Sequence, residues 1–140
     1  MTTEHVSLPR KITNKLWHQA QLSPEQEVCG LLGIKENKIS YYPIVNIAEK
    51  PQQQFLLDPQ QQINAMVTMR ENNEQLFAIY HSHPTAPAEP SVTDLAMTTY
   101  SDALLLIISL NTKGVLELRG FRVNNQQVAE VTLSLYDGNY

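Results

Sequence analysis

The sequence has one cysteine, no long hydrophobic run and no excess of positive charge. Cys29 is the only cysteine among 140 residues, so no internal disulfide can form and nothing indicates an oxidising compartment. The apolar run at 103–110 is far shorter than the ~20 residues of a membrane-spanning helix. The net charge of −4 provides no basic surface for nucleic acid. We therefore expect neither a nucleic-acid partner nor a membrane.

Several signals for other locations and other chemistries are also missing. The first residues, MTTEHVSLPRK, contain no apolar core of the kind that a signal peptide has, so we expect a cytoplasmic protein. The sequence has no His-Glu-x-x-His, no glycine-rich phosphate loop and no Gly-x-Ser-x-Gly. It also lacks the Cys-x-x-Cys that, together with His-x-Glu, would indicate a zinc deaminase.

The composition that remains is that of an ordinary globular domain. Hydrophobic residues make up 42% of the chain and charged residues 17%, so a sizeable core can be buried. With 140 residues and no repeat or linker, we expect residues 1–140 to form a single domain.

Hydrophobic spacing predicts alternating helices and strands. Helical spacing predicts helices over 10–21, from Asp58-Pro59 onward and over 91–101. Apolar or alternating runs predict strands at 6–8, 27–34, 38–47, 55–57, 76–83, 103–109, 115–123 and 127–135. Gly30 and Gly33 indicate close backbone approach in the second of these strands. Because hairpins and helical crossovers both occur, we expect an α/β protein with a mixed β-sheet flanked by helices.

The segment 80–94, YHSHPTAPAEPSVTD, holds the residues with the clearest chemistry. His81 and His83 stand two positions apart at the end of a predicted strand, so both side chains point to one face, about 7 Å apart. Asp94 follows eleven positions later, where the next helix begins. Two imidazoles and one carboxylate form the three-ligand set of a catalytic zinc site, which leaves a fourth position for water.

Each part of this pattern also has a simpler interpretation. His81 and His83 could be ordinary surface or hydrogen-bonded histidines, and Ser91 with Asp94 fits a helix capping box. The capping box is compatible with a metal, because the helix dipole keeps the Asp94 carboxylate ionised, as a metal requires. Glu89 is a rival carboxylate, but its proline-rich connection is a less firm mount than a helix terminus. The prediction of a metal site therefore depends on the combination.

Glu27 is a further candidate from a distant part of the chain. It opens an apolar strand, where carboxylates are rare unless they are paired or coordinating, although it could also lie at the strand's edge in water. Zinc lowers the pKa of its bound water to about 7, and Glu27 could act as general base and pass the proton to a leaving amine. Ser91 could donate a hydrogen bond to a developing oxyanion. Cys29 is a nucleophile only in principle, because a buried thiol is usually inert.

These residues together resemble the signature of the JAMM metalloproteases, the MPN-plus class of the MPN domain family. The signature is a glutamate, then His-x-His, seven residues, a serine, two residues and an aspartate. Five positions match it: Glu27, His81, His83, Ser91 and Asp94. Similar surroundings are Glu27–Gly33, Asn46 ahead of Phe55 and Asp58-Pro59, and Glu89-Pro90-Ser91. The resemblance spans roughly residues 12–110, and small stand-alone prokaryotic members are most similar in size.

The resemblance implies an MPN fold, which is cytidine-deaminase-like, with one Zn2+ per chain. His81, His83 and Asp94 would be the ligands, Glu27 the general base and Ser91 the support of the oxyanion. It also implies a peptidase or isopeptidase that cuts an amide bond after the C-terminal Gly-Gly of a ubiquitin-like or sulfur-carrier protein. The chain lacks the long insertions with which eukaryotic relatives grip ubiquitin, so a small ubiquitin-like carrier or a plain peptide is the expected substrate.

Two other functions stay open on the sequence. MPN-minus relatives are non-catalytic scaffolds or interaction modules, although they have usually lost the ligands that this chain keeps. A purely structural ion would need a fourth protein ligand, which Glu89 or Cys29 would have to supply. The ligand set could also hold iron, manganese or cobalt, and the sequence indicates no oligomeric state.

Overall fold

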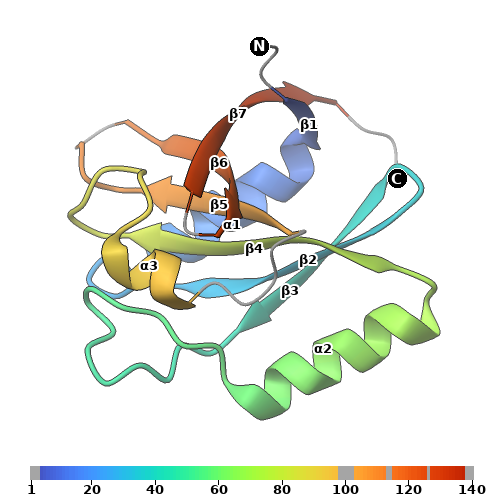
Figure 1. Cartoon of the computed structure of the whole chain (residues 1–140), viewed down its shortest axis with the longest axis horizontal. Helices are drawn as coiled ribbons and strands as arrows, with labels where there is room; N and C mark the ends of the chain where they lie inside the picture. Colours follow the sequence, from blue (N-terminus) through green and yellow to red (C-terminus); the bar gives the residue numbers. More distant parts are fainter. Residues whose placement is uncertain (1–3, 98–102, 113–114, 126, 138–140) are drawn as a thin grey trace.

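A mixed sheet forms the centre of the computed structural model, which describes residues 4–97, 103–112, 115–125 and 127–137 (Figure 1). Within these residues the sheet has seven strands in the order β1-β7-β6-β5-β4-β2-β3. The strands are β1 (His5–Pro9), β2 (Cys29–Lys35), β3 (Lys38–Ile44), β4 (Gln75–His83), β5 (Leu104–Ser109), β6 (Glu117–Asn124) and β7 (Gln127–Tyr136). β1/β7 and β4/β5 are parallel, and the other neighbours are antiparallel. The predicted α/β class with a mixed sheet is confirmed.

Helices cover both faces of this sheet. They are α1 (Arg10–Leu22), α2 (Pro59–Glu71) and α3 (Val92–Met97). In Figure 1, α1 lies behind the strands and α3 in front of them. Leu104 and Leu106 of β5 pack in the same apolar cluster as α1, whereas Leu105 and Ile107 pack with Leu95 of α3. β5 is therefore covered on both faces, because successive strand residues point to opposite sides.

The predicted helix boundaries follow local signals. α1 begins directly after Pro9 and buries Ile12, Leu16 and Ala20 against the sheet. The carboxylate of Asp58 caps α2 by accepting a hydrogen bond from the backbone N–H of Gln61 at 3.0 Å. None of the helices in the described residues is long and apolar enough to cross a membrane.

Two predicted elements differ from the observed ones around the segment 45–58, which joins β3 to α2. The expected strand at 55–57 is only an isolated bridge between Asn46 and Leu57. Its backbone does not form a ladder, because the N–H of Leu56 donates to the side-chain oxygen of Asn46. β3 ends at Ile44 rather than at Ile47, and the next N–H, that of Val45, donates to the Gln61 side chain at 2.9 Å. The helix expected over 91–101 is α3, and the remainder, 98–101, lies outside the described residues.

Candidate metal centre

Strand pairing brings the glutamate and the two histidines together. β4 lies between β5 and β2 and carries His81 and His83 at its end. The N–H of Val28 donates to the hydroxyl of Ser82 at 2.9 Å, and the N–H of Ser82 donates to the carbonyl of Val28 at 3.0 Å. These two bonds continue the pairing of β2 with β4 beyond Cys29, so Glu27 lies beside the histidines.

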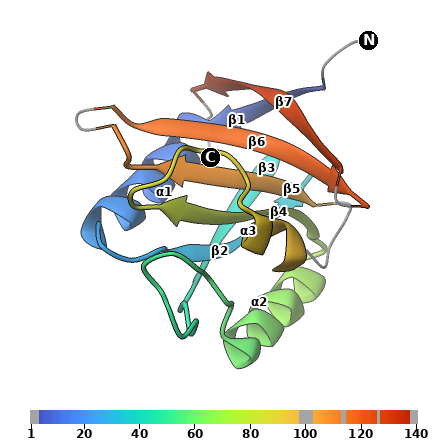
Figure 2. The same ribbon diagram turned by 60° about the vertical axis from the view of Figure 1, so that its left-hand side comes forward.

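The connection after β4 returns Asp94 to the same place. In Figures 1 and 2 it loops out past the end of the strand and comes back to α3, which lies beside β4. Ala88 is buried in the cluster of Leu105 and Phe121, and Ala86 accepts a hydrogen bond from the Ser109 hydroxyl at 2.7 Å. The proline-rich connection is therefore seated on the sheet, and the start of α3 is held over the histidines.

The three predicted ligands converge on one point. Nε2 of His81 lies 3.0 Å from Nε2 of His83, and each of these atoms lies 3.0 Å from Oδ2 of Asp94. A tetrahedral zinc ion with ligand bonds of about 2.0–2.1 Å keeps its ligand atoms roughly 3.3 Å apart. The triangle therefore has the size, and the two-nitrogen, one-oxygen donor set, that such an ion requires.

Glu27 is the fourth acidic or basic group at this point. Ligand atoms of Glu27, His81, His83 and Asp94 all lie within 4.8 Å of one another, and all four residues are buried. Glu27 is only 4% exposed, so the alternative that placed it at a strand edge in water is wrong. Its Oε1 has no hydrogen-bond partner among the described residues. An unpaired buried carboxylate is costly, and a cation or a polarised water beside it would remove that cost.

The two imidazoles are held differently. Nδ1 of His83 lies 2.7 Å from the carbonyl oxygen of Pro87. Because a carbonyl only accepts, Nδ1 carries a proton, so in the neutral ring the Nε2 lone pair faces the cluster. The ring of His81 instead stacks on Phe55, and its Nδ1 is buried without a partner in the part of the chain that the structure describes.

Asp94 serves two roles at once. The backbone N–H of Ser91 donates to Oδ2 of Asp94 at 3.0 Å, and the N–H of Asp94 donates to the hydroxyl of Ser91 at 2.9 Å. This is the reciprocal capping arrangement that the sequence predicted. The same Oδ2 faces the histidines, so the capping and metal interpretations are compatible. The Ser91 hydroxyl accepts in this pair and keeps its own proton as a donor.

Burial and neighbouring groups shift the pKa values of the cluster. Burial raises the pKa of Glu27 to about 7, against the opposing effect of His83. Burial also lowers the pKa of His81 and favours its neutral form. Burial alone would raise the pKa of Asp94, but hydrogen bonds from His81 and His83 hold it well below its usual range. The site thus combines an imidazole that favours its neutral form and an ionised carboxylate, which are the protonation states that a metal requires, with a glutamate of raised pKa.

The rival ligands lie elsewhere. Glu89 is exposed, and its carboxylate pairs with the guanidinium of Arg119 at 3.4 Å. The thiol of Cys29 donates to the carbonyl of Ile44 at 3.4 Å, and burial raises its pKa to about 12. Neither residue belongs to the cluster. The structure therefore offers no support for a closed structural site completed by Glu89 or Cys29.

Three residues around the site were not assigned a role from the sequence. Ser82 is buried and joins β4 to Val28, and its position between two histidines that share a face, which turns Ser82 to the opposite face, is the signal in the sequence. Asn46 and Phe55 were noticed only as part of the family resemblance. Their contacts come from residues far apart in the chain, so no local pattern indicates them.

Comparison with known proteins identifies the family. A family model described as prokaryotic homologues of the JAB domain matches residues 9–122. The chain is 28% identical over 129 residues to the CysO-cysteine peptidase of Mycobacterium tuberculosis, covering 90% of this chain and 88% of that protein. It is 26% identical over 116 residues to the desampylase of Haloferax volcanii, covering 78% and 84% of the two chains.

A solved structure has the same fold. The solution structure of a protein from Desulfitobacterium hafniense matches with a TM-score of 0.79 and 29% identity, covering 96% of this chain and 94% of that one. The two relatives named above are described as a peptidase and a desampylase. The family model spans most of the chain and all five signature positions. The chain therefore belongs to the prokaryotic homologues of the JAB domain, the small prokaryotic JAMM class that its sequence resembles.

Proposed function

We propose that the protein is a zinc-dependent metallopeptidase with one Zn2+ per chain, bound by Nε2 of His81, Nε2 of His83 and Oδ2 of Asp94. The observation that supports this most is the triangle of donor atoms, 3.0 Å apart, beside the buried carboxylate of Glu27. Zinc in such a site is a Lewis acid that polarises a carbonyl and lets water ionise near pH 7.

Glu27 is the general base in this proposal. Its carboxylate takes a proton from the attacking water and then gives the proton to the nitrogen of the leaving amine. Two features suit Glu27 to this role, since its Oε1 has no competing partner among the described residues and burial raises its pKa to about 7. A group with this pKa is present in both protonation states near neutral pH.

Ser91 stabilises the oxyanion in the same proposal. Its hydroxyl is fixed by the N–H of Asp94, and its proton can be donated to a substrate oxygen. Replacing Ser91 with alanine should leave zinc in place and lower kcat by about 10²–10³-fold, as loss of one oxyanion donor does.

The proposed substrate is an amide or isopeptide bond after the C-terminal Gly-Gly of a ubiquitin-like or sulfur-carrier protein. The names of the relatives, a CysO-cysteine peptidase and a desampylase, support this substrate class. We place the reaction in the cytoplasm, as the single cysteine led us to expect.

Cleavage of defined substrates tests the proposal. The zinc-loaded protein is incubated with two substrates: a ubiquitin-like sulfur carrier ending in Gly-Gly-Cys, and a carrier joined through Gly-Gly to a lysine peptide. The products are identified by mass spectrometry. We expect cleavage directly after Gly-Gly, and none with Glu27→Gln that retains zinc. Stable capture of the carrier without cleavage by the wild type would instead favour the non-catalytic scaffold.

A further inference from the structure

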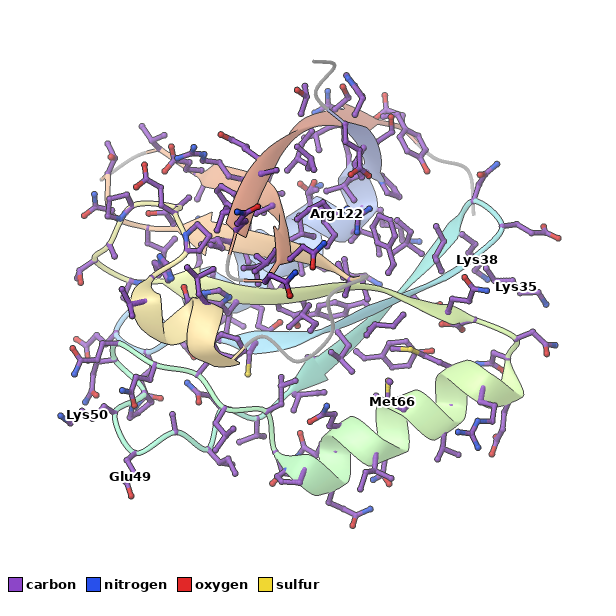
Figure 3. The ribbon with its side chains drawn as sticks, in the orientation of Figure 1. Lys35, Lys38, Glu49, Lys50, Met66 and Arg122 are labelled. Atoms are coloured by element: carbon purple, nitrogen blue, oxygen red, sulfur yellow. The ribbon has the colours of Figure 1, made fainter. Side chains whose placement is uncertain are left out.

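The segment 45–58 contacts both Glu27 and His81 of the candidate site. It is the green loop between β3 and α2 in Figure 2. Glu49 and Lys50 point away from the molecule (Figure 3). The carbonyl of Pro51 accepts a hydrogen bond from the N–H of Glu27 at 2.7 Å, and Phe55 stacks on His81. The proposed base and one proposed ligand thus share a single supporting segment.

The carboxamide of Asn46 holds this segment in shape. Its Nδ2 donates to the carbonyl of Glu27 and to the carbonyl of Gln54, both at 2.9 Å. Its Oδ1 accepts from the N–H of Ala48 at 3.0 Å and from the N–H of Leu56 at 2.9 Å. A carboxamide has two N–H donors and an oxygen with two lone pairs, so all four positions are used.

These bonds connect the two functional contacts. The backbone of Glu27 is held at its N–H by Pro51 and at its carbonyl by Asn46. The two residues that flank Phe55 are both bonded to the Asn46 side chain. A shift of the segment would therefore move Glu27 and, at the same time, remove the stacking of Phe55 on the His81 imidazole.

We propose that Asn46 is a positioning residue, which fixes the Glu27 carboxylate relative to the ligands by tying the start of β2 to the segment 45–58. The proposal rests on the function proposed above for Glu27. The proposed ligands lie on β4 and α3, whereas the four bonds of the Asn46 carboxamide go to Glu27 and to the segment 45–58. Loss of the Asn46 donors should therefore impair proton transfer much more than zinc binding.

Two substitutions separate the donors from a change of charge. Asn46→Asp keeps the size and both acceptor bonds but removes both donors, and Asn46→Ala removes all four bonds without adding charge. The matched control is Asn64→Asp, the same change at an exposed position of α2. Each variant is measured for zinc per chain, for amide hydrogen exchange without zinc, and for kcat and KM on the Gly-Gly-Cys carrier.

We expect both Asn46 variants to retain about one zinc per chain and to lose about 10- to 100-fold in kcat with little change in KM. The amide of Glu27 should exchange faster in both variants and that of Leu56 faster in Asn46→Ala, while the amides of β4 stay protected. Asn64→Asp should match the wild type in every measurement. A fall in kcat confined to Asn46→Asp would reflect the new charge and overturn the proposal, as would loss of zinc from both Asn46 variants.

Hydrogen exchange separates this proposal from the function on which it rests. If the wild type cleaves no substrate, the proposed function fails, yet faster exchange at Glu27 in the variants still supports the structural role of Asn46. If the wild type cleaves and both variants match it, the positioning role alone is overturned. If neither variant folds, hydrogen exchange of the wild-type protein tests the proposal. Protected Ala48 and Leu56 amides support it, and amides that exchange like those of exposed loops contradict it.

Discussion

The imidazole of His81 lies against the ring of Phe55, with 4.3 Å between the ring centroids and 18° between the planes. His81 is fully buried and Phe55 nearly so. Stacking on one face restricts rotation of the imidazole, which leaves Nε2 directed at His83 and Asp94. An orienting contact of this kind matters for a metal ligand, because affinity depends on how well each donor is held in place.

Replacing Phe55 with alanine should weaken zinc binding as well as the fold. The cavity should lower the free energy of unfolding by about 3 kcal/mol, and the freed His81 ring should reduce zinc affinity about 10-fold. Chemical denaturation and competitive zinc titration measure the two effects. Leu16→Ala is the control, because Leu16 of α1 is fully buried in a cluster that includes neither Phe55 nor a residue of α3. An equal loss of zinc affinity in both variants would show that the effect is not specific to the stack.

Asp94→Asn should abolish stoichiometric zinc binding, because the amide is a poor ligand and loses the charge that attracts the ion. Zinc per chain, measured by elemental analysis of untagged protein, should fall from about one to near zero. Glu89→Gln is the matched control, since Glu89 pairs with Arg119 outside the cluster. Retention of zinc by Asp94→Asn, or its loss from Glu89→Gln, would contradict the proposed ligand set.

The pKa of Glu27 makes the stability of the zinc-free protein depend on pH. The folded protein holds this proton up to about pH 7, whereas the unfolded chain releases it near pH 4.5. The folded state therefore binds more protons between these values, so the contribution of Glu27 is fully present below pH 4.5 and is lost as pH rises through 7. The loss amounts to roughly 3 kcal/mol at most.

Glu27→Gln isolates this contribution. Urea unfolding of zinc-free wild type and variant should give similar stabilities near pH 5, and the wild type should become progressively less stable than the variant toward pH 8. Since the other titrating groups are common to both proteins, their effects largely cancel in the difference. A difference that does not change with pH would mean that Glu27 is ionised throughout this range.

Gly30 and Gly33 should respond differently to alanine, although both were predicted to mark close backbone approach. A Cβ at Gly30 would collide with the hydroxyl of the buried Tyr80 and with the backbone carbonyl of Tyr42. A Cβ at Gly33 would meet mainly the carboxylate end of Glu74, a side chain that can move. We expect Gly30→Ala to lower stability by about 3 kcal/mol or more and Gly33→Ala by about 1 kcal/mol. Equal thermal unfolding temperatures for the two variants would contradict the assigned contacts.

The sequence by itself determined the elements and the ligand spacing, because both depend on short-range periodicity. His81 and His83 share a face because side chains alternate along a strand. Ser91 and Asp94 form a capping box because their spacing spans the first helical turn. The buried runs of β4 and β5 mark the centre of the sheet by composition alone.

Only the tertiary structure decided what surrounds the ligands. Glu27 lies beside His81 because β2 pairs with β4, and nothing local to Glu27 states which strand will be its neighbour. The segment 55–57 has a strand-like sequence, yet the Asn46 side chain takes its N–H and leaves an isolated bridge. Strand pairing and side-chain hydrogen bonds between distant residues depend on the whole packed arrangement. A pattern along the chain therefore predicts the ligands, whereas the placement of the base and its support follows from the fold.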